Sequence, residues 1–226
     1  MQTVARMDFT AVKTEGAILP AELLARVAEG RDLPGLTPRD YHLAASERLN
    51  EAVNRAWNRC LGAWAGFEEG RERLAEADAG TTLTRERWLL ILFQELGYGR
   101  LQTARAADMG GYPISHAWGA VPIHLVSFRQ DLDRRGAFTG GVTRSPHGLV
   151  QEHLNRTDAT LWGFVSNGLR LRILRDNASL SRQAYVDFDL EAIMRGQLYA
   201  DFALLWLLCH QSRVEGERPS EWWLER

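Results

Sequence analysis

The sequence predicts an α/β (α+β) domain preceded by a helical N-terminal extension, and three observations carry this prediction. Signals for strands and helices alternate after residue 84. The pair Asn167-Gly168 separates two short apolar runs, which is the strongest local signal for a hairpin. In the first third of the chain, apolar residues recur at helical spacing. We therefore expect the extension to occupy residues 1–80 and the α/β domain residues 81–226.

The composition is ordinary for a globular domain. Of the 226 residues, 45% are apolar and 25% are charged, and the formal net charge of −2 creates no strong overall field toward nucleic acid or an anionic membrane. Cys60 and Cys209 lie in apolar helical contexts, which predicts buried thiols in a reducing cytosol. The longest apolar run, Phe202 to Cys209, is too short to span a bilayer, and no signal peptide begins the chain. We expect a cytoplasmic protein with no membrane partner.

Helices dominate the predicted extension, although residues 1–17 give no clear signal. Residues 19–29 predict a short helix, with a proline at its start and Gly30 just past its end. Thr37 and Asp40 form a capping-box pattern ahead of a long helix. That long helix carries an apolar stripe, interpreted as a packing face, which consists of Leu49, Val53, Ala56, Trp57, Cys60, Trp64 and Phe67.

The predicted α/β domain begins with a buried helix over residues 85–96, capped by Thr84 and ended by Gly97. The last helix is apolar nearly all round, so we expect it to be enclosed in the core or against another part of a larger protein. The predicted sheet has about four or five strands. The elements expected after the first helix are strands at 112–118 and 121–128, a helix at 145–155, strands at 161–166, 169–175 and 184–188, and a helix at 199–213.

The middle of the chain resembles a known family. A helix bearing Gln151, a strand ending in Ser166-Asn167-Gly168 and a strand leaving it resemble the core of PD-(D/E)XK nucleases, especially the N-terminal nuclease domains of type I restriction subunits and type IIG restriction-modification enzymes. The segments SPHGLVQEHLNR, LWGFVSNGLRLRILRDN and YADFALLWLLCHQSR are similar to N-terminal regions of large adenine-specific DNA methyltransferases of DISARM-type phage-defence systems. The similarity begins at about residue 18 and is most specific over residues 122–213.

The resemblance implies a restriction-endonuclease-like core whose active site is carried by the hairpin at 112–128. Such nucleases place an aspartate on the first strand and Glu-x-Lys on the second, where the carboxylates hold Mg²⁺ and the lysine orients the attacking water. Here Ser127 stands in the glutamate position and Arg129 in the lysine position, and the first strand has no aspartate. Because a hydroxyl cannot supply the charge that binds Mg²⁺, the sequence predicts a degenerate PD-(D/E)XK site without a metal.

Other residues could take over the missing chemistry. Asp131 and Asp133 share one face with Arg129 if the strand continues, and catalytic acids migrate in the superfamily that this chain resembles. The alternative is that both aspartates belong to a charged loop. Glu95 lies where related helices sometimes carry a metal-site acid, or else it is a solvated glutamate. Gln151 would help position a phosphate or a water molecule, or else it is exposed on its helix.

The absence of two motifs limits the cofactors. A methyltransferase of the family that this chain resembles needs a glycine-rich loop for S-adenosylmethionine and an Asn-Pro-Pro-aromatic motif for the flipped adenine, and the sequence contains neither. We expect S-adenosylmethionine only in the remainder of a larger parent enzyme, and Mg²⁺ only if nuclease activity survives. His116 and His124 could approach each other on facing strands, but no third ligand stands at zinc spacing.

Arginines mark the expected DNA surface. Residues 129–182 contain nine arginines and five acidic residues, whereas the rest of the chain is net acidic. We expect Arg129, Arg144, Arg170 and Arg172 to contact phosphates, since the guanidinium fork suits phosphate oxygens. In the alternative interpretation these arginines form ion pairs on a solvated face, with Glu152, Asp158, Asp176 and Asp187 as partners.

Three functions fit these patterns. The first is a DNA-engaging, catalytically degenerate nuclease-like domain of a restriction-modification or phage-defence adenine-specific DNA methyltransferase, whose partners are DNA and the rest of that enzyme or other defence-system subunits. The second is an active Mg²⁺-dependent endonuclease with shifted carboxylates. The third is a purely structural docking domain. Trp222 and Trp223, which we expect to be exposed, would suit an interface.

Overall fold

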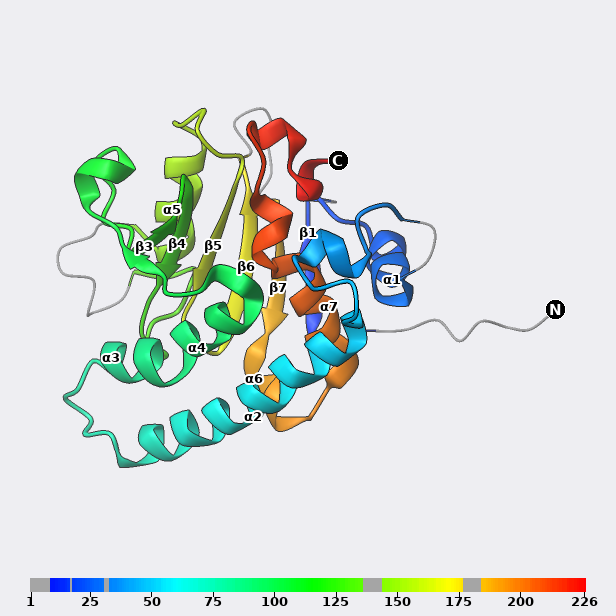
Figure 1. Cartoon of the computed structure of the whole chain (residues 1–226). Coiled ribbons are helices and arrows are strands. Elements are labelled where there is room, and N and C mark those ends of the chain that lie inside the picture. The colour runs from blue at the N-terminus through cyan, green and yellow to red at the C-terminus, as the bar shows by residue number, and fades with distance from the viewer. Residues whose placement is uncertain (1–8, 17, 31–32, 136–143, 177–183) are drawn as a thin grey trace.

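A mixed sheet forms the centre of the computed structural model (Figure 1). The structure describes residues 9–16, 18–30, 33–135, 144–176 and 184–226. Within this part of the chain the sheet has seven strands in the order β1-β7-β6-β5-β4-β3-β2. The strands are β1 (Val12–Glu15), β2 (Gln102–Thr103), β3 (His116–Trp118), β4 (Val121–Leu125), β5 (Trp162–Ser166), β6 (Arg170–Arg175) and β7 (Tyr185–Asp189).

Neighbouring strands are antiparallel at every pairing except β4–β5, which is parallel. A parallel pair requires a crossover, and the segment between β4 and β5 contains the helix α5 (Pro146–Leu154). Ser145 caps this helix, because its hydroxyl accepts a hydrogen bond from the Gly148 amide at 3.1 Å. The predicted β5–β6 hairpin is confirmed, with Ser166 paired to Leu171 beside the turn.

Helices cover both faces of the sheet (Figure 1). On one face, α5 packs on β4, β5 and β6, with Val150 and Leu154 against Val165 and Leu174. The larger apolar cluster lies on the other face, where alternate strand residues meet the remaining long helices. The remaining α-helices are α1 (Ala21–Glu29), α2 (Leu49–Arg73), α3 (Thr81–Thr84), α4 (Leu90–Phe93), α6 (Leu190–Arg195) and α7 (Tyr199–Cys209).

The larger cluster joins the helical extension to the rest of the chain. The predicted apolar stripe of α2 faces it, and α7 is buried over most of its length. The Tyr41 hydroxyl donates to the Leu207 carbonyl at 3.1 Å, and the Trp206 indole donates to the Glu95 carbonyl at 2.8 Å. The extension therefore shares one apolar core with the sheet.

The helix predicted at 85–96 lies within a longer helical segment, since π-helical turns at Arg85–Leu89 and Gln94–Tyr98 flank α4. Gly97 has a φ of 87° and leaves the helical conformation there, close to the predicted end. Short 3₁₀ turns complete the described elements: Pro38–Tyr41, Ala106–Met109, Gln211–Val214, Pro219–Glu221 and Trp223–Glu225.

Two strand predictions need correction. The strand predicted at 112–118 covers only 116–118, because the preceding residues turn after Gly110 and Gly111, both of which have positive φ. The sheet also exceeds the predicted four or five strands. β1 and β2 gave no strand signal, since β1 has four residues and β2 has two.

The chain end was also predicted wrongly in part. Trp222 is only 5% exposed, so it is not a surface residue. The Trp223 indole donates to the Pro34 carbonyl at 2.9 Å and stacks against the Arg213 guanidinium. These contacts attach the end of the chain to the loop before the first 3₁₀ turn. The last helix is shorter than predicted, because His210 leaves the helical conformation with ψ of 142°.

Candidate functional site

The candidate site lies where the chain leaves β4, beside the β5–β6 turn. The Val126 amide donates to the Ser166 carbonyl at 2.8 Å, which extends the pairing of β4 with β5 by one residue. The Asn167 side-chain amide donates to the Gln130 carbonyl at 2.8 Å. The same side chain accepts hydrogen bonds from the Leu169 and Arg170 amides through its oxygen. Asn167 therefore holds both the turn and the neighbouring loop.

Ser127 joins this loop to the helix that begins at Thr81. It is 2% exposed, and its hydroxyl donates to the Ala79 carbonyl and accepts from the Arg129 amide. The Thr84 hydroxyl adds a second link, since it donates to the Gly80 carbonyl and accepts from the Phe128 amide. The position at which the resemblance expects a glutamate thus forms structural hydrogen bonds and presents no carboxylate.

Arg129 remains exposed beside this joint. Its guanidinium donates to the Ala75 carbonyl at 3.1 Å and lies over the Phe128 ring, 5.2 Å from the centroid. No carboxylate among the described residues forms an ion pair with it. Arg134 and Arg135, a few residues further along, are also exposed and have no such partner in the described part of the chain. We refer to Arg129, Arg134 and Arg135 as the arginine loop.

A hollow of about 320 Å³ opens beside Arg129. Its wall includes Phe128, and the Arg71 guanidinium also lies over this ring at 5.0 Å. The other charged residues of the hollow balance one another, because Arg195 pairs with Glu68 at 2.6 Å. The hollow therefore has an aromatic wall and one arginine, Arg129, with no carboxylate partner.

The two aspartates proposed as shifted ligands have structural roles. The Asp131 carboxylate accepts a hydrogen bond from the Asp133 amide at 2.7 Å, as in a loop cap. The Asp133 carboxylate receives two hydrogen bonds from Arg172, at 2.6 and 2.8 Å. These bonds lower the pKa of Asp133. Within the described residues, no three His, Cys, Asp or Glu side chains are grouped so that they could hold a metal ion.

The structure brings neither Glu95 nor Gln151 to Ser127. The Glu95 carboxylate pairs with Arg59 of α2 at 2.9 Å, and burial raises its pKa. The Gln151 amide donates to the Arg175 carbonyl at 3.0 Å. Arg175 is paired with the first residue of β5, whereas Ser127 follows β4 at the level of the last residue of β5. Gln151 thus faces the opposite end of the sheet.

Three of the four arginines expected to contact DNA are held in ion pairs. Arg170 binds Asp187 at 2.7 Å and Asp189 at 3.3 Å. Arg144 pairs with Glu152, as the ion-paired alternative suggested. Arg129 is the fourth, and its guanidinium is the one still available to a phosphate.

Arg172 lies at the centre of the largest of these networks. Only 5% of its side chain is exposed, and the same holds for Asp187, 3.3 Å away. The His147 ring lies 3.3 Å from one of its nitrogens, and the Tyr185 ring stacks on the guanidinium at 4.7 Å. Sequence analysis missed the Asp133–Arg172 pair. Alternation indicated the face on which Arg172 lies, but no local pattern joins residues 39 positions apart.

His116 and His124 are both buried, and each is tied to Ser115. The Ser115 amide donates to His124 Nδ1 at 3.2 Å, and the Ser115 hydroxyl lies 2.8 Å from His116 Nδ1. Burial lowers the pKa of both histidines to about 4, and the nearby Arg85 lowers it further. Both side chains are therefore neutral at pH 7 and serve the β3–β4 hairpin.

Comparisons with family models, with curated proteins and with solved structures found no match for this chain. In the described residues, no helix has the length and apolar character needed to cross a membrane. The site must therefore be interpreted from its own geometry.

Replacing Arg172 by alanine should destabilise the fold by about 3 kcal/mol, because it leaves the buried Asp187 without its partner. Replacing Arg170, whose side chain is 38% exposed, should cost about 1 kcal/mol or less. Urea unfolding of both variants measures the difference. If R172A costs no more than R170A, the Arg172 network does not stabilise the fold.

Acid should destabilise the protein in a defined window. Burial lowers the pKa of His147 to about 4 and that of His210 to about 3, in addition to the shifts of His116 and His124. An unfolded histidine titrates near ~6.5, so the unfolded chain binds more protons below that pH. The stability from these neutral histidines is complete above pH ~6.5 and falls toward pH ~4, by up to about 1.4 kcal/mol per pH unit for each histidine.

Urea unfolding between pH 7.5 and 4.5 measures this slope. The variant H147Q, which cannot titrate at that position, should show a shallower dependence than the original chain. A free energy of unfolding that stays constant from pH 7 to pH 5 would contradict the prediction.

Proposed function

We propose that this chain is a non-cleaving, nuclease-like domain that engages DNA as part of a restriction-modification or phage-defence adenine-specific DNA methyltransferase. The observation that carries the proposal is the end of β4. There, Ser127 is tied into the structure, while Arg129 stays exposed without a carboxylate partner among the described residues. A site built this way can bind a phosphate, but it does not present two carboxylates to a metal ion.

The order of elements supports the nuclease-like part of the proposal. The β3–β4 hairpin leads through α5 to β5, which is parallel to β4, and then to the antiparallel β6. This agrees with the hairpin, helix and two strands that the resemblance implies. The resemblance also supplies the parent enzyme, in whose remaining part S-adenosylmethionine would bind.

The arginine loop supports the DNA-engaging part. Guanidinium groups form forked, charge-assisted hydrogen bonds to phosphate oxygens, and such contacts position a duplex without reading its sequence. Arg129 is held by the Ala75 carbonyl and the Phe128 ring, so less freedom is lost when it binds. Arg144, Arg170 and Arg172 already use their donors within the protein.

The ion pairs of these last three arginines favour a second candidate, a structural docking domain that never contacts DNA. The two functions differ in the arginine loop, since a docking domain does not need it. The third function, a nuclease with shifted carboxylates, would need Asp133 to leave its bidentate pair with Arg172.

The triple variant R129A/R134A/R135A should weaken DNA binding equally for all sequences. The dependence of log affinity on log salt should become shallower by about one unit for each lost phosphate contact. Fluorescence anisotropy with a labelled duplex at several salt concentrations measures both effects. The matched control is R59A/R73A/R218A, which removes three exposed arginines elsewhere. Equal affinity and slope in the two variants would leave the docking domain as the function.

The chain should not nick supercoiled plasmid in the presence of Mg²⁺, because the end of β4 presents no pair of carboxylates. Agarose electrophoresis after prolonged incubation measures this, with EDTA as the control. Nicking that disappears in the D131N or D133N variant would establish the active nuclease and refute the non-cleaving domain.

A further inference from the structure

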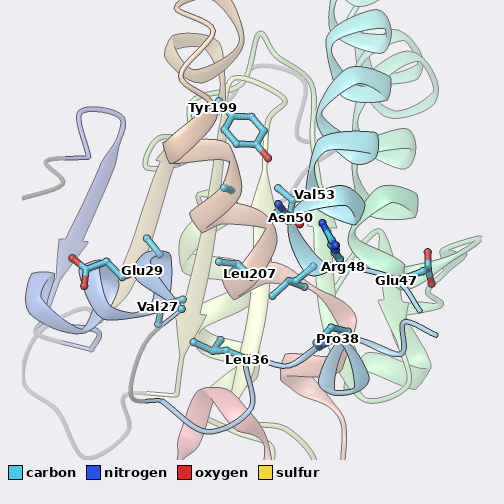
Figure 2. Close-up of a pocket in the computed structure, with 14 residues that line it drawn as sticks. Val27, Glu29, Leu36, Pro38, Glu47, Arg48, Asn50, Val53, Tyr199 and Leu207 are labelled. Carbon is cyan, nitrogen blue, oxygen red and sulfur yellow. The ribbon is translucent and has the colours of Figure 1, made fainter. Parts of the chain in front are cut away.

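A groove of about 590 Å³ lies far along α2 from the arginine loop and has no part in the proposed function (Figure 2). It runs between the end of α1, the beginning of α2 and the middle of α7, with the loop around Leu36 and Pro38 at one end. Its size falls within the range of about 300–1,000 Å³ typical of binding pockets. Its surface is mainly apolar, with Val27, Leu36, Val53, Ala203 and Leu207 among the lining residues.

Tyr199 distinguishes this groove from the rest of the surface. It is 39% exposed, and it is the one large hydrophobic side chain that is exposed in the described part of the chain. Figure 2 shows its ring at one end of the groove, above Asn50 and Val53. An exposed aromatic ring that adjoins an apolar groove is typical of a surface that binds another molecule.

Two charges face each other across the groove. Arg48 stands at the beginning of α2 and Glu29 at the end of α1, with Val27 and Leu207 between them (Figure 2). Neither has an ion-pair partner among the described residues. Glu47, next to Arg48, is already bound to Arg55 at 2.7 Å.

Both charges stand where their own helix disfavours them. The N-terminal end of a helix carries a partial positive charge and the C-terminal end a partial negative charge. Arg48 is a cation at the positive end of α2, and Glu29 is an anion at the negative end of α1. Each placement is locally unfavourable by a few tenths of a kcal/mol or more. Complementary charges brought by a bound molecule would relieve both.

We propose that this groove docks an apolar-faced helical segment of a partner protein, which places an acidic side chain at Arg48 and a basic side chain at Glu29. An amphipathic helix can insert side chains from one face into such a groove. It can also carry opposite charges at its two ends, which matches the spacing of Arg48 and Glu29 on opposite walls. A small apolar ligand would leave both charges without partners.

The test is a selection of 12-residue peptides from a displayed random library on the full chain. Selected peptides should share apolar residues at helical spacing, with an acid toward one end and a base toward the other. The variant A203W, which fills the groove, should lower their affinity by about tenfold or more. A65W places the same ring on an exposed part of α2 outside the groove and should leave the affinity unchanged. Fluorescence anisotropy measures both.

A charge reversal provides a second arm that does not depend on A203W folding. In R48E both walls are acidic, so the selected peptides should bind about tenfold more weakly, and changing their acid to lysine should restore binding. The proposal is overturned if the selected peptides bind A203W as well as A65W, or if R48E binds them unchanged. It is also overturned if the chain dimerises through the groove, shown by a dimer that A203W abolishes.

Discussion

The candidate site depends on one joint, in which the Asn167 side chain holds the loop after β4 against the β5–β6 turn. Gly168 makes the joint possible. Its φ of 83° suits the turn, and a Cβ there would lie 2.7 Å from the Thr84 side chain. The Trp88 indole donates to the Gly168 carbonyl at 2.8 Å, which fastens the helical segment to the same turn. Backbone groups that would otherwise be buried without partners are satisfied here.

This joint explains how the end of β4 can keep its shape without catalytic residues. In a metal-dependent nuclease, the ion and its carboxylates are strong local constraints. Here hydrogen bonds from Ser127, Thr84 and Asn167 hold the same loop. Arg129 is thereby presented to solvent, while the charged residues on β6 serve the internal network around Arg172. The loss of cleavage chemistry and the retention of a defined surface are therefore compatible.

The features that the sequence predicted well are those with local causes. The β5–β6 hairpin follows from its Asn-Gly turn, α5 from its serine cap, and the buried side of α2 from the spacing of its apolar residues. The missed features depend on partners far along the chain. β1 is a strand because β7 offers it an open edge, and Trp222 is buried because the loop around Pro34 packs at the chain end. Similarly, alternation identified the face of Arg172, whereas Asp133 as its partner depends on the path of the loop after β4.

The long helix α2 relates the two surfaces of the molecule. It has 25 residues and spans about 37 Å at ~1.5 Å per residue. Near its last turn, Arg71 packs on Phe128 beside the arginine loop, and at its first turn Leu49 lines the apolar groove. Between these ends, Trp57 and Trp64 are buried in the core that α2 shares with the sheet. Because this packing resists bending, a protein docked in the groove would leave the arginine loop uncovered and would be held at a fixed distance from any DNA bound there.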